Sequence, residues 1–192
     1  MEEKEEEEMI TKIENIVREA CAKNEGKYQY EYHIQIVRKY AKILAKKYHA
    51  NEKVVDLIAL LHDIGRLKYG PKKHAITGAR EAEKILQKFN YDKNLIKEVK
   101  MGILSHRHSS SRKAESIEAK VVKDADALSH FDTIPILFTV AFYHIKMKPE
   151  DAWGWIFSKI QRDWRTLNLP ESRKIARKKY EAANLILKGV MK

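Results

Sequence analysis

The sequence predicts an all-α protein. Apolar residues recur at steps of three and four along most of its 192 residues, which is the spacing of one face of a helix. No stretch alternates between apolar and polar residues clearly enough to predict a strand. The chain has 7 glycines and 4 prolines, and so few of either disfavour a turn-rich all-β fold. We therefore expect about eight or nine helices around one core.

The first helices are amphipathic. Apolar stripes run from Ile10 to Ala20 and from Ile34 to Tyr48. The acidic residues before the first stripe are expected to form a frayed lead-in. Residues 54–64 are apolar nearly all round, which is typical of a helix buried at the centre of a protein. Gly65 is expected to end this helix in a left-handed conformation.

The same pattern continues through the rest of the chain. The pair Gly70 and Pro71 marks residues 66–73 as a loop. Later boundaries are a polar connection at 109–113, a cap at Asp132 and Thr133, and the prolines Pro149 and Pro170. The helices expected between these boundaries are 75–89, 93–105, 116–131, one beginning at about 134, one from 149 that carries Trp153 and Trp155, and 171–187.

The amino-acid composition excludes several classes of protein. Hydrophobic residues (44%) and charged residues (34%) together exclude a disordered or fibrous chain. The single cysteine, Cys21, excludes an internal disulfide framework and a CxxC site. The net charge of +11 suits anionic small substrates or nucleic acid. The acidic start is unlike a secretory signal, and the longest apolar run is too short to span a bilayer, so we expect a cytoplasmic protein with no membrane partner.

Histidine and aspartate side chains lie among apolar residues at several places. His62 and Asp63 end the buried helix, and adjacent helical residues point about 100° apart, so both reach one ion only beyond the helix end. A carboxylate beside an apolar run is costly to bury unless it is paired or metal-bound. Imidazole and carboxylate together suit Mn, Fe, Co, Ni, Mg or Zn. The other candidates are His33, His74, His106, Asp124 and Asp126, with His108 expected on the surface.

These residues resemble the H…HD…D signature of the HD-domain metal-dependent phosphohydrolase superfamily. His33, the stretch from Ala59 to Arg66, and Asp126 carry the signature, and the central piece is similar to the HDIG-type subgroup. Residues 118–126 resemble the EAKxxxDAD stretch of small bacterial and archaeal members, and the likeness covers about residues 28–132. The resemblance implies an orthogonal helical bundle around a divalent metal held by His33, His62, Asp63 and Asp126.

The resemblance also implies roles for neighbouring residues. Arg66 stands where HDIG-type relatives often carry a phosphate-contacting lysine. His74 matches a histidine that contacts phosphate in some relatives and a second metal in others, and His106 matches a second-metal histidine of dinuclear members. Lys72 and Lys73 would draw an anionic substrate toward the loop by general electrostatics. Asp63, Arg66 and His74 are thus the expected catalytic residues.

Two questions stay open in the sequence. Asp124 and Asp126 lie two apart and cannot face the same way on a helix, and we favour Asp126 as the ligand because the family's register falls there. The aromatic cluster of Trp153, Trp155, Phe157 and Trp164 suits either a base-stacking wall or core packing, and we favour packing.

We accordingly predict three regions in the chain. Residues 1–27 form an N-terminal helix with an acidic lead-in, 28–132 the metal-binding core, and 133–192 a helical extension packed on the same domain. The predicted function is metal-dependent hydrolysis of a phosphate ester or anhydride in a small phosphorylated substrate such as a nucleotide. The alternatives are a dinuclear phosphodiesterase or dinucleotide hydrolase and a non-catalytic nucleotide- or RNA-binding protein. Nucleic acid is the less favoured partner, and a homodimer is an open alternative.

Overall fold

The protein is all-α, as predicted. The computed structural model describes residues 2–24, 27–107 and 112–189, and helices without any strand make up the regular structure of these residues. The elements are α1 (Glu2–Asn24), α2 (Lys27–Gln29), the π-helical segment η1 (Tyr30–Ile34), α3 (Gln35–Tyr48), α4 (Glu52–Leu61), α5 (Ile64–Tyr69), α6 (His74–Lys88), α7 (Lys93–Ser105), α8 (Ile117–Asp132), α9 (Ile134–Thr139), the π-helical segment η2 (Val140–His144), α10 (Pro149–Arg165) and α11 (Pro170–Gly189).

Local signals in the sequence explain where several helices begin. The side chain of Asn51 accepts hydrogen bonds from the Lys53 and Val54 amides at 3.1 and 3.2 Å and caps α4. Asp92 caps α7 in the same way, and Ser116 caps α8. Thr133 precedes α9, but its hydroxyl donates back to the Ser129 carbonyl instead of capping the next helix.

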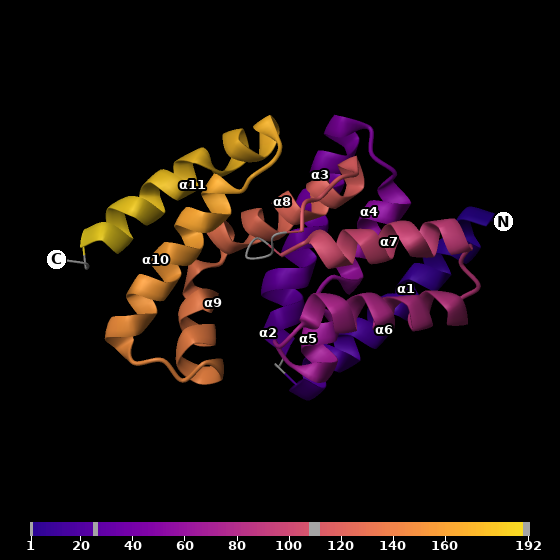
Figure 1. Ribbon diagram of the computed structural model, residues 1–192, viewed down its shortest axis with the longest axis horizontal. Helices are drawn as coiled ribbons and strands as arrows, with labels where there is room; N and C mark the ends of the chain where they lie inside the picture. Colours follow the sequence, from indigo (N-terminus) through magenta and orange to yellow (C-terminus); the bar gives the residue numbers. More distant parts are fainter. Residues whose placement is uncertain (1, 25–26, 108–111, 190–192) are drawn as a thin grey trace.

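Helix α8 is the centre of the molecule. It packs against α3, α4, α7 and α11, and residues 121–131 are buried without a break. Figure 1 shows α9, α10 and α11 together on one side, α1 to α7 on the other, and α8 between them. We call α9, η2, α10 and α11 the C-terminal segment. Since α8 touches both groups, its polar residues lie where the two meet.

Gly65 does not end the central helix in a left-handed conformation. Helix α4 ends at Leu61, and Gly65 lies inside the short helix α5 without a positive φ angle. A Cβ atom on Gly65 would lie 2.2 Å from the His74 carbonyl oxygen and 2.3 Å from the Gly78 nitrogen. Glycine is needed here because α5 and α6 cross backbone against backbone, and the expectation of a left-handed stop was wrong.

Two further expectations need correction. The acidic start is helical from Glu2, and Glu6 pairs with Lys53 at 2.8 Å, so α1 is tied to α4 near its beginning. Helix α5 also occupies the first part of the predicted loop 66–73. His108 and most of the polar connection at 109–113 lie outside the described residues. Among the residues that are described, no helix is long and apolar enough to cross a membrane.

Candidate metal centre

The first group of candidate ligands joins η1 to the turn between α4 and α5. His33 projects from η1, a π-helical segment of the kind that often marks a functional site. His62 and Asp63 occupy the turn, and all three residues are buried. The two Nε2 atoms lie 3.1 Å apart, and Asp63 Oδ2 lies 3.6 Å from that of His33 and 3.8 Å from that of His62.

Hydrogen bonds on the far side of these rings set their orientation. His62 Nδ1 donates to the Ala59 carbonyl at 2.8 Å. His33 Nδ1 lies 3.0 Å from Ser129 Oγ, whose own proton is donated to the Asp126 carbonyl, so the imidazole is the donor. Both Nε2 atoms therefore present lone pairs to each other and to a carboxylate. Such a cluster of electron pairs is stabilised by a cation.

A second pair of imidazoles faces the other oxygen of Asp63. His74, the first residue of α6, and His106, just after α7, place their Nε2 atoms 3.3 Å apart. Asp63 Oδ1 lies 3.6 Å from the first and 3.9 Å from the second. Their Nδ1 atoms donate to the carbonyls of Pro71 and Ile103 at 3.0 and 2.6 Å. Asp63 thus stands between two histidine pairs, with one oxygen toward each.

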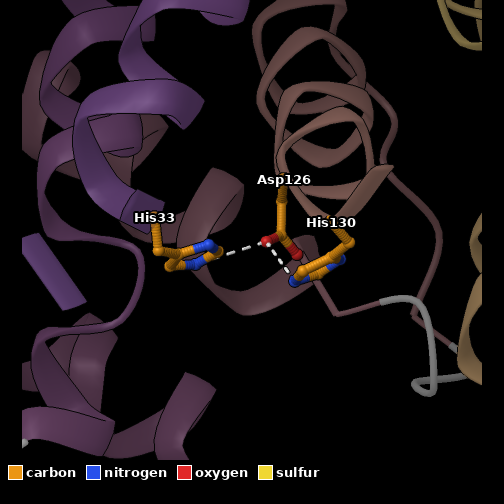
Figure 2. A group of neighbouring side chains, drawn as sticks. All are labelled: His33, Asp126 and His130. Atoms are coloured by element: carbon orange, nitrogen blue, oxygen red, sulfur yellow. Dashed lines mark ion pairs between the residues drawn. The ribbon is translucent and has the colours of Figure 1, made fainter. Parts of the chain in front are cut away.

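A third group lies on the α8 side of His33. His33 Nε2 is 3.5 Å from Asp126 Oδ1, and His130 Nε2 is 3.6 Å from the same oxygen. Figure 2 shows His33 approaching Asp126 and His130 from a separate helix. The His130 and His33 rings stack with centroids 5.4 Å apart and 10° between their planes. His33 therefore belongs to two groups at once.

The surroundings of the centre lower the pKa of two of its acids and of one histidine, which keeps all three deprotonated. Burial alone would raise the pKa of Asp63, but His62, His33 and Arg66 hold that pKa well below its usual range. The pKa of Asp126 is lowered in the same way, against its burial, chiefly by His130 and His33. Burial, and next to it the unfavourable interaction with the neighbouring His62, lowers the pKa of His106 to about 4.

This donor set fits a divalent cation. Three groups, each within 4.8 Å, offer imidazole nitrogens and carboxylate oxygens: His33, Asp126 and His130; His33, His62 and Asp63; and Asp63, His74 and His106. Neutral imidazole with ionised carboxylate suits first-row ions such as Mn, Fe, Co, Ni or Zn and does not single out one of them. The centre would hold such an ion through atoms that the fold already aims inward.

A cavity of about 210 Å³ opens over the centre. We call the candidate ligands that line it the floor of the cavity. The C-terminal segment also lines it and supplies an apolar face. Basic side chains are also part of the lining. The floor includes Asp63, His74, His106 and Asp126, the apolar face includes Ile136, Leu137, Val140, Ile145 and Trp155, and the basic residues are Arg66, Arg107, Lys159 and Arg162.

The structure brings most of the predicted site residues together. Apart from the fully buried His62, the predicted ligands and Arg66 line the cavity, whereas Lys72 and Lys73 are exposed and are not among its described lining residues. Asp124 points elsewhere, because its carboxylate accepts hydrogen bonds from Asn168 and Leu169. Each ligand that the resemblance implied belongs to one of the three donor groups. These ligands are His33, His62, Asp63 and Asp126, with His74 and His106 for a second ion.

Sequence reasoning missed His130, Asp163 and Lys159. His130 Nδ1 lies 3.0 Å from Asp163 Oδ2, and Lys159 lies 3.4 Å from that oxygen. A signal for His130 was present, because it lies four residues after Asp126 on a predicted helix and so on the same face. The sequence contains no such signal for Asp163 or Lys159. Of the tryptophans, Trp155 lines the cavity, while Trp164 stacks on Tyr180 and Trp153 packs against Phe138.

Fold and site define an all-helical protein whose buried histidines and aspartates surround candidate metal positions. Residues 30–130 match the family model of the HD domain, more than half of the chain, and the protein belongs to that family. HD domains bind divalent metals, in agreement with the donor groups described above. The family match spans the residues from η1 to α8 that carry the predicted ligands.

Two solved structures show the same fold. An HD-superfamily hydrolase of Bacillus thuringiensis has a TM-score of 0.73 and 22% identity, covering 97% of this chain and 96% of that one. Bacillus subtilis YpgQ, solved in complex with ADP, has a TM-score of 0.72 and 23% identity, covering 97% of this chain and 95% of that one. The likeness runs through the C-terminal segment as well as the HD domain.

A curated relative matches part of the chain. A tRNA (cytidine(56)-2'-O)-methyltransferase of Picrophilus torridus is 35% identical over 112 residues, which are 53% of this chain and 32% of that protein. The chain thus spans about a third of the length of the curated relative that it matches.

Proposed function

We propose that this protein is a divalent-metal-dependent phosphohydrolase that acts on a small phosphorylated substrate, most naturally a nucleotide. The observation that carries the proposal is the placement of Asp63 between two inward-facing histidine pairs on the floor of a basic cavity. His33, His62, Asp63 and Asp126 would hold one ion. When bound, a divalent ion lowers the pKa of a coordinated water and polarises a phosphoryl oxygen.

The chain's own residues suit an anionic substrate. Arg66 of α5, Arg107 after α7, and Lys159 and Arg162 of α10 all line the cavity and place positive charge near the ligand floor. Such fixed charges stabilise the charge that develops on a phosphoryl group during its transfer. His74 lies at the same floor, where it would contact either phosphate or a second ion.

The C-terminal segment favours a nucleotide over a simple phosphate. Trp155 and the aliphatic residues beside it offer an apolar face in a cavity whose other walls are basic. A nucleotide has matching ends, because its base is flat and stacks on aromatic rings while its phosphates are charged. YpgQ, which shares the fold, was solved with ADP bound.

A dinuclear centre is the second candidate arrangement, and the His74–His106 pair favours it. The two Nε2 atoms of this pair face Asp63 Oδ1, so His74, His106 and Asp63 would hold a second ion. Two adjacent ions stabilise both the attacking and the leaving oxygen, which suits phosphodiester cleavage as well. We carry neither methyl transfer nor a tRNA substrate over from the curated relative, because the match spans 32% of that protein.

The test is release of phosphate and pyrophosphate from nucleoside mono-, di- and triphosphates and from dinucleotides. The reactions contain Mn²⁺, Co²⁺, Ni²⁺ or Mg²⁺, and wild type is compared with Asp63→Ala. We expect turnover by wild type and a loss of at least about 1,000-fold in Asp63→Ala, because that change removes the carboxylate shared by both histidine pairs. Asp151→Ala, which removes an exposed carboxylate, is the matched control and should leave turnover unchanged.

Metal counting separates the two arrangements. Purified protein loaded with Mn²⁺ is expected to hold about two ions per chain, and His106→Gln about one, if the second histidine pair binds its own ion. Turnover that survives in Asp63→Ala would refute the assignment. Tight, steeply salt-dependent binding of long RNA without any hydrolysis would instead favour the non-catalytic alternative.

A further inference from the structure

His130 is a buried histidine that the predicted ligand set does not contain. It lies on α8, four residues after Asp126, and its ring is held from both ends. Nδ1 lies 3.0 Å from Asp163 Oδ2, and Nε2 lies 3.6 Å from Asp126 Oδ1. Asp163 is fully buried on α10, so the histidine connects the C-terminal segment with the metal centre.

The bond to Asp163 orients the lone pair of His130. Asp163 also pairs with Lys159 at 3.4 Å, which favours its ionised form. A carboxylate accepts but cannot donate, so His130 Nδ1 carries the proton and Nε2 carries the lone pair. This repeats the arrangement of the other four inward histidines, each of which is anchored through Nδ1 and presents Nε2. A carboxylate behind an imidazole is a common support for a metal ligand.

The spacing of the donors fits one coordination shell. His33 Nε2 and His130 Nε2 lie 3.5 and 3.6 Å from Asp126 Oδ1, and the three donors lie within 4.8 Å of one another. With metal–ligand bonds of about 2.0–2.2 Å, neighbouring donors stand roughly 3–3.5 Å apart and opposite ones roughly 4.2 Å apart. Figure 2 shows the imidazoles of His33 and His130 on either side of the Asp126 carboxylate, with both dashed lines ending on the same oxygen.

We infer that His130 is a further ligand of the divalent ion held by His33 and Asp126, and that Asp163 of α10 positions it. The centre then includes a residue whose orientation depends on the C-terminal segment. Seating of α10 and metal binding are therefore coupled, because displacement of α10 would free the His130 ring. The inference concerns the ion that the proposed function uses, but its test needs no substrate.

Anomalous diffraction from wild-type crystals soaked in Mn²⁺ alone is the direct test. We expect an Mn²⁺ peak within about 2.4 Å of His130 Nε2 and bonded also to His33 and Asp126. A peak on His33 and Asp126 that lies more than about 3 Å from His130 Nε2 would overturn the inference. This measurement uses no variant, so it remains decisive even if substitutions at His130 impair folding.

Titration with Mn²⁺ gives the complementary test in solution. His130→Gln should weaken Mn²⁺ binding by about 100-fold, and Asp163→Asn, which keeps the size but loses the charge behind the ring, by about 10-fold. His49→Asn removes an exposed imidazole at a left-handed position that asparagine tolerates, and it should bind Mn²⁺ as wild type does. Circular dichroism checks that each variant is folded.

The outcomes separate this inference from the proposed function. Wild-type affinity in folded His130→Gln would overturn the ligand role. Weakened affinity in His130→Gln with no effect of Asp163→Asn would overturn the positioning role of Asp163 alone. A protein that binds Mn²⁺ through His130 yet releases no phosphate from any substrate would refute the phosphohydrolase while leaving this inference intact.

Discussion

At the residue scale, two aspartates of α8 that lie two positions apart have different roles: one stabilises the fold and the other lies at the metal centre. Asp124 is fully buried and accepts hydrogen bonds from the Asn168 amide at 2.8 Å, the Asn168 side chain at 2.7 Å and the Leu169 amide at 2.8 Å. It fastens the link between α10 and α11 to the central helix. Asp126, two residues on, points instead between His33 and His130.

Replacing each of these aspartates by asparagine should therefore have different effects. Asp124→Asn should lower the free energy of unfolding by about 2–3 kcal/mol, because hydrogen bonds to a charged acceptor are lost in a buried place. Asp126→Asn should weaken Mn²⁺ binding by at least about 10-fold with a smaller change in stability. Urea unfolding of metal-free protein and Mn²⁺ titration measure the two effects. Equal losses of stability in both variants would contradict this division of roles.

At the element scale, the crossing of α5 and α6 positions ligands of both histidine pairs. Gly65 and Gly78 let the two backbones meet, and a Cβ on Gly65 would lie 2.7 Å from Gly78 Cα. Asp63 lies just before α5, and His74 begins α6. The distance between these two side chains is thus set by a contact in which there is no room for a methyl group.

Gly65→Ala should force the two helices apart. We expect a loss of about 1–3 kcal/mol in the free energy of unfolding, as for other overpacked sites, and a measurable loss of Mn²⁺ affinity because His74 moves from Asp63. Gly154→Ala is the matched control, since no atom lies within 4 Å of its added Cβ. In the interior of α10 it should be neutral or stabilise by up to about 1 kcal/mol. Wild-type unfolding and metal affinity in Gly65→Ala would show that the crossing is not needed.

At the scale of the whole molecule, the metal centre is built from elements that lie far apart in the sequence. Its candidate ligands come from η1, the α4–α5 turn, α6, the end of α7 and α8. In the metal-free state they bring ionised carboxylates and imidazole lone pairs together, which costs free energy. A bound cation would offset this cost and cross-link elements that lie far apart in the sequence.

Divalent metal should therefore stabilise the protein as a whole. At a Mn²⁺ concentration about 100 times Kd, one site adds about 2.7 kcal/mol. For a chain of this size, the thermal midpoint should then rise by roughly 5–10 °C relative to protein in EDTA. Differential scanning calorimetry measures the shift, which Asp63→Ala should lack. The same rise in Asp63→Ala would mean that the metal binds elsewhere.

Much of the fold and part of the site were predictable from the sequence. Apolar periodicity located the helices because it reflects local geometry, as in residues 34–48, where the predicted stripe and α3 nearly coincide. Local sequence patterns did not predict the role of Gly65. Glycine is needed there because the backbone of α6 lies so close, and a local pattern contains no information about that contact. The predicted ligands His33, His62, Asp63 and Asp126 followed from a family signature that retains residue types and order.

Sequence by itself determined the all-α class, the order of the helices and the residue types that gather at the centre. Tertiary structure decided which atoms face one another. It placed Asp63 between two histidine pairs, turned Asp124 away from the site, brought Asp163 of α10 behind His130 and set Trp155 in the cavity wall. The physical reason is that helix periodicity depends on neighbours three or four residues apart, whereas these contacts join segments that only packing around α8 brings together.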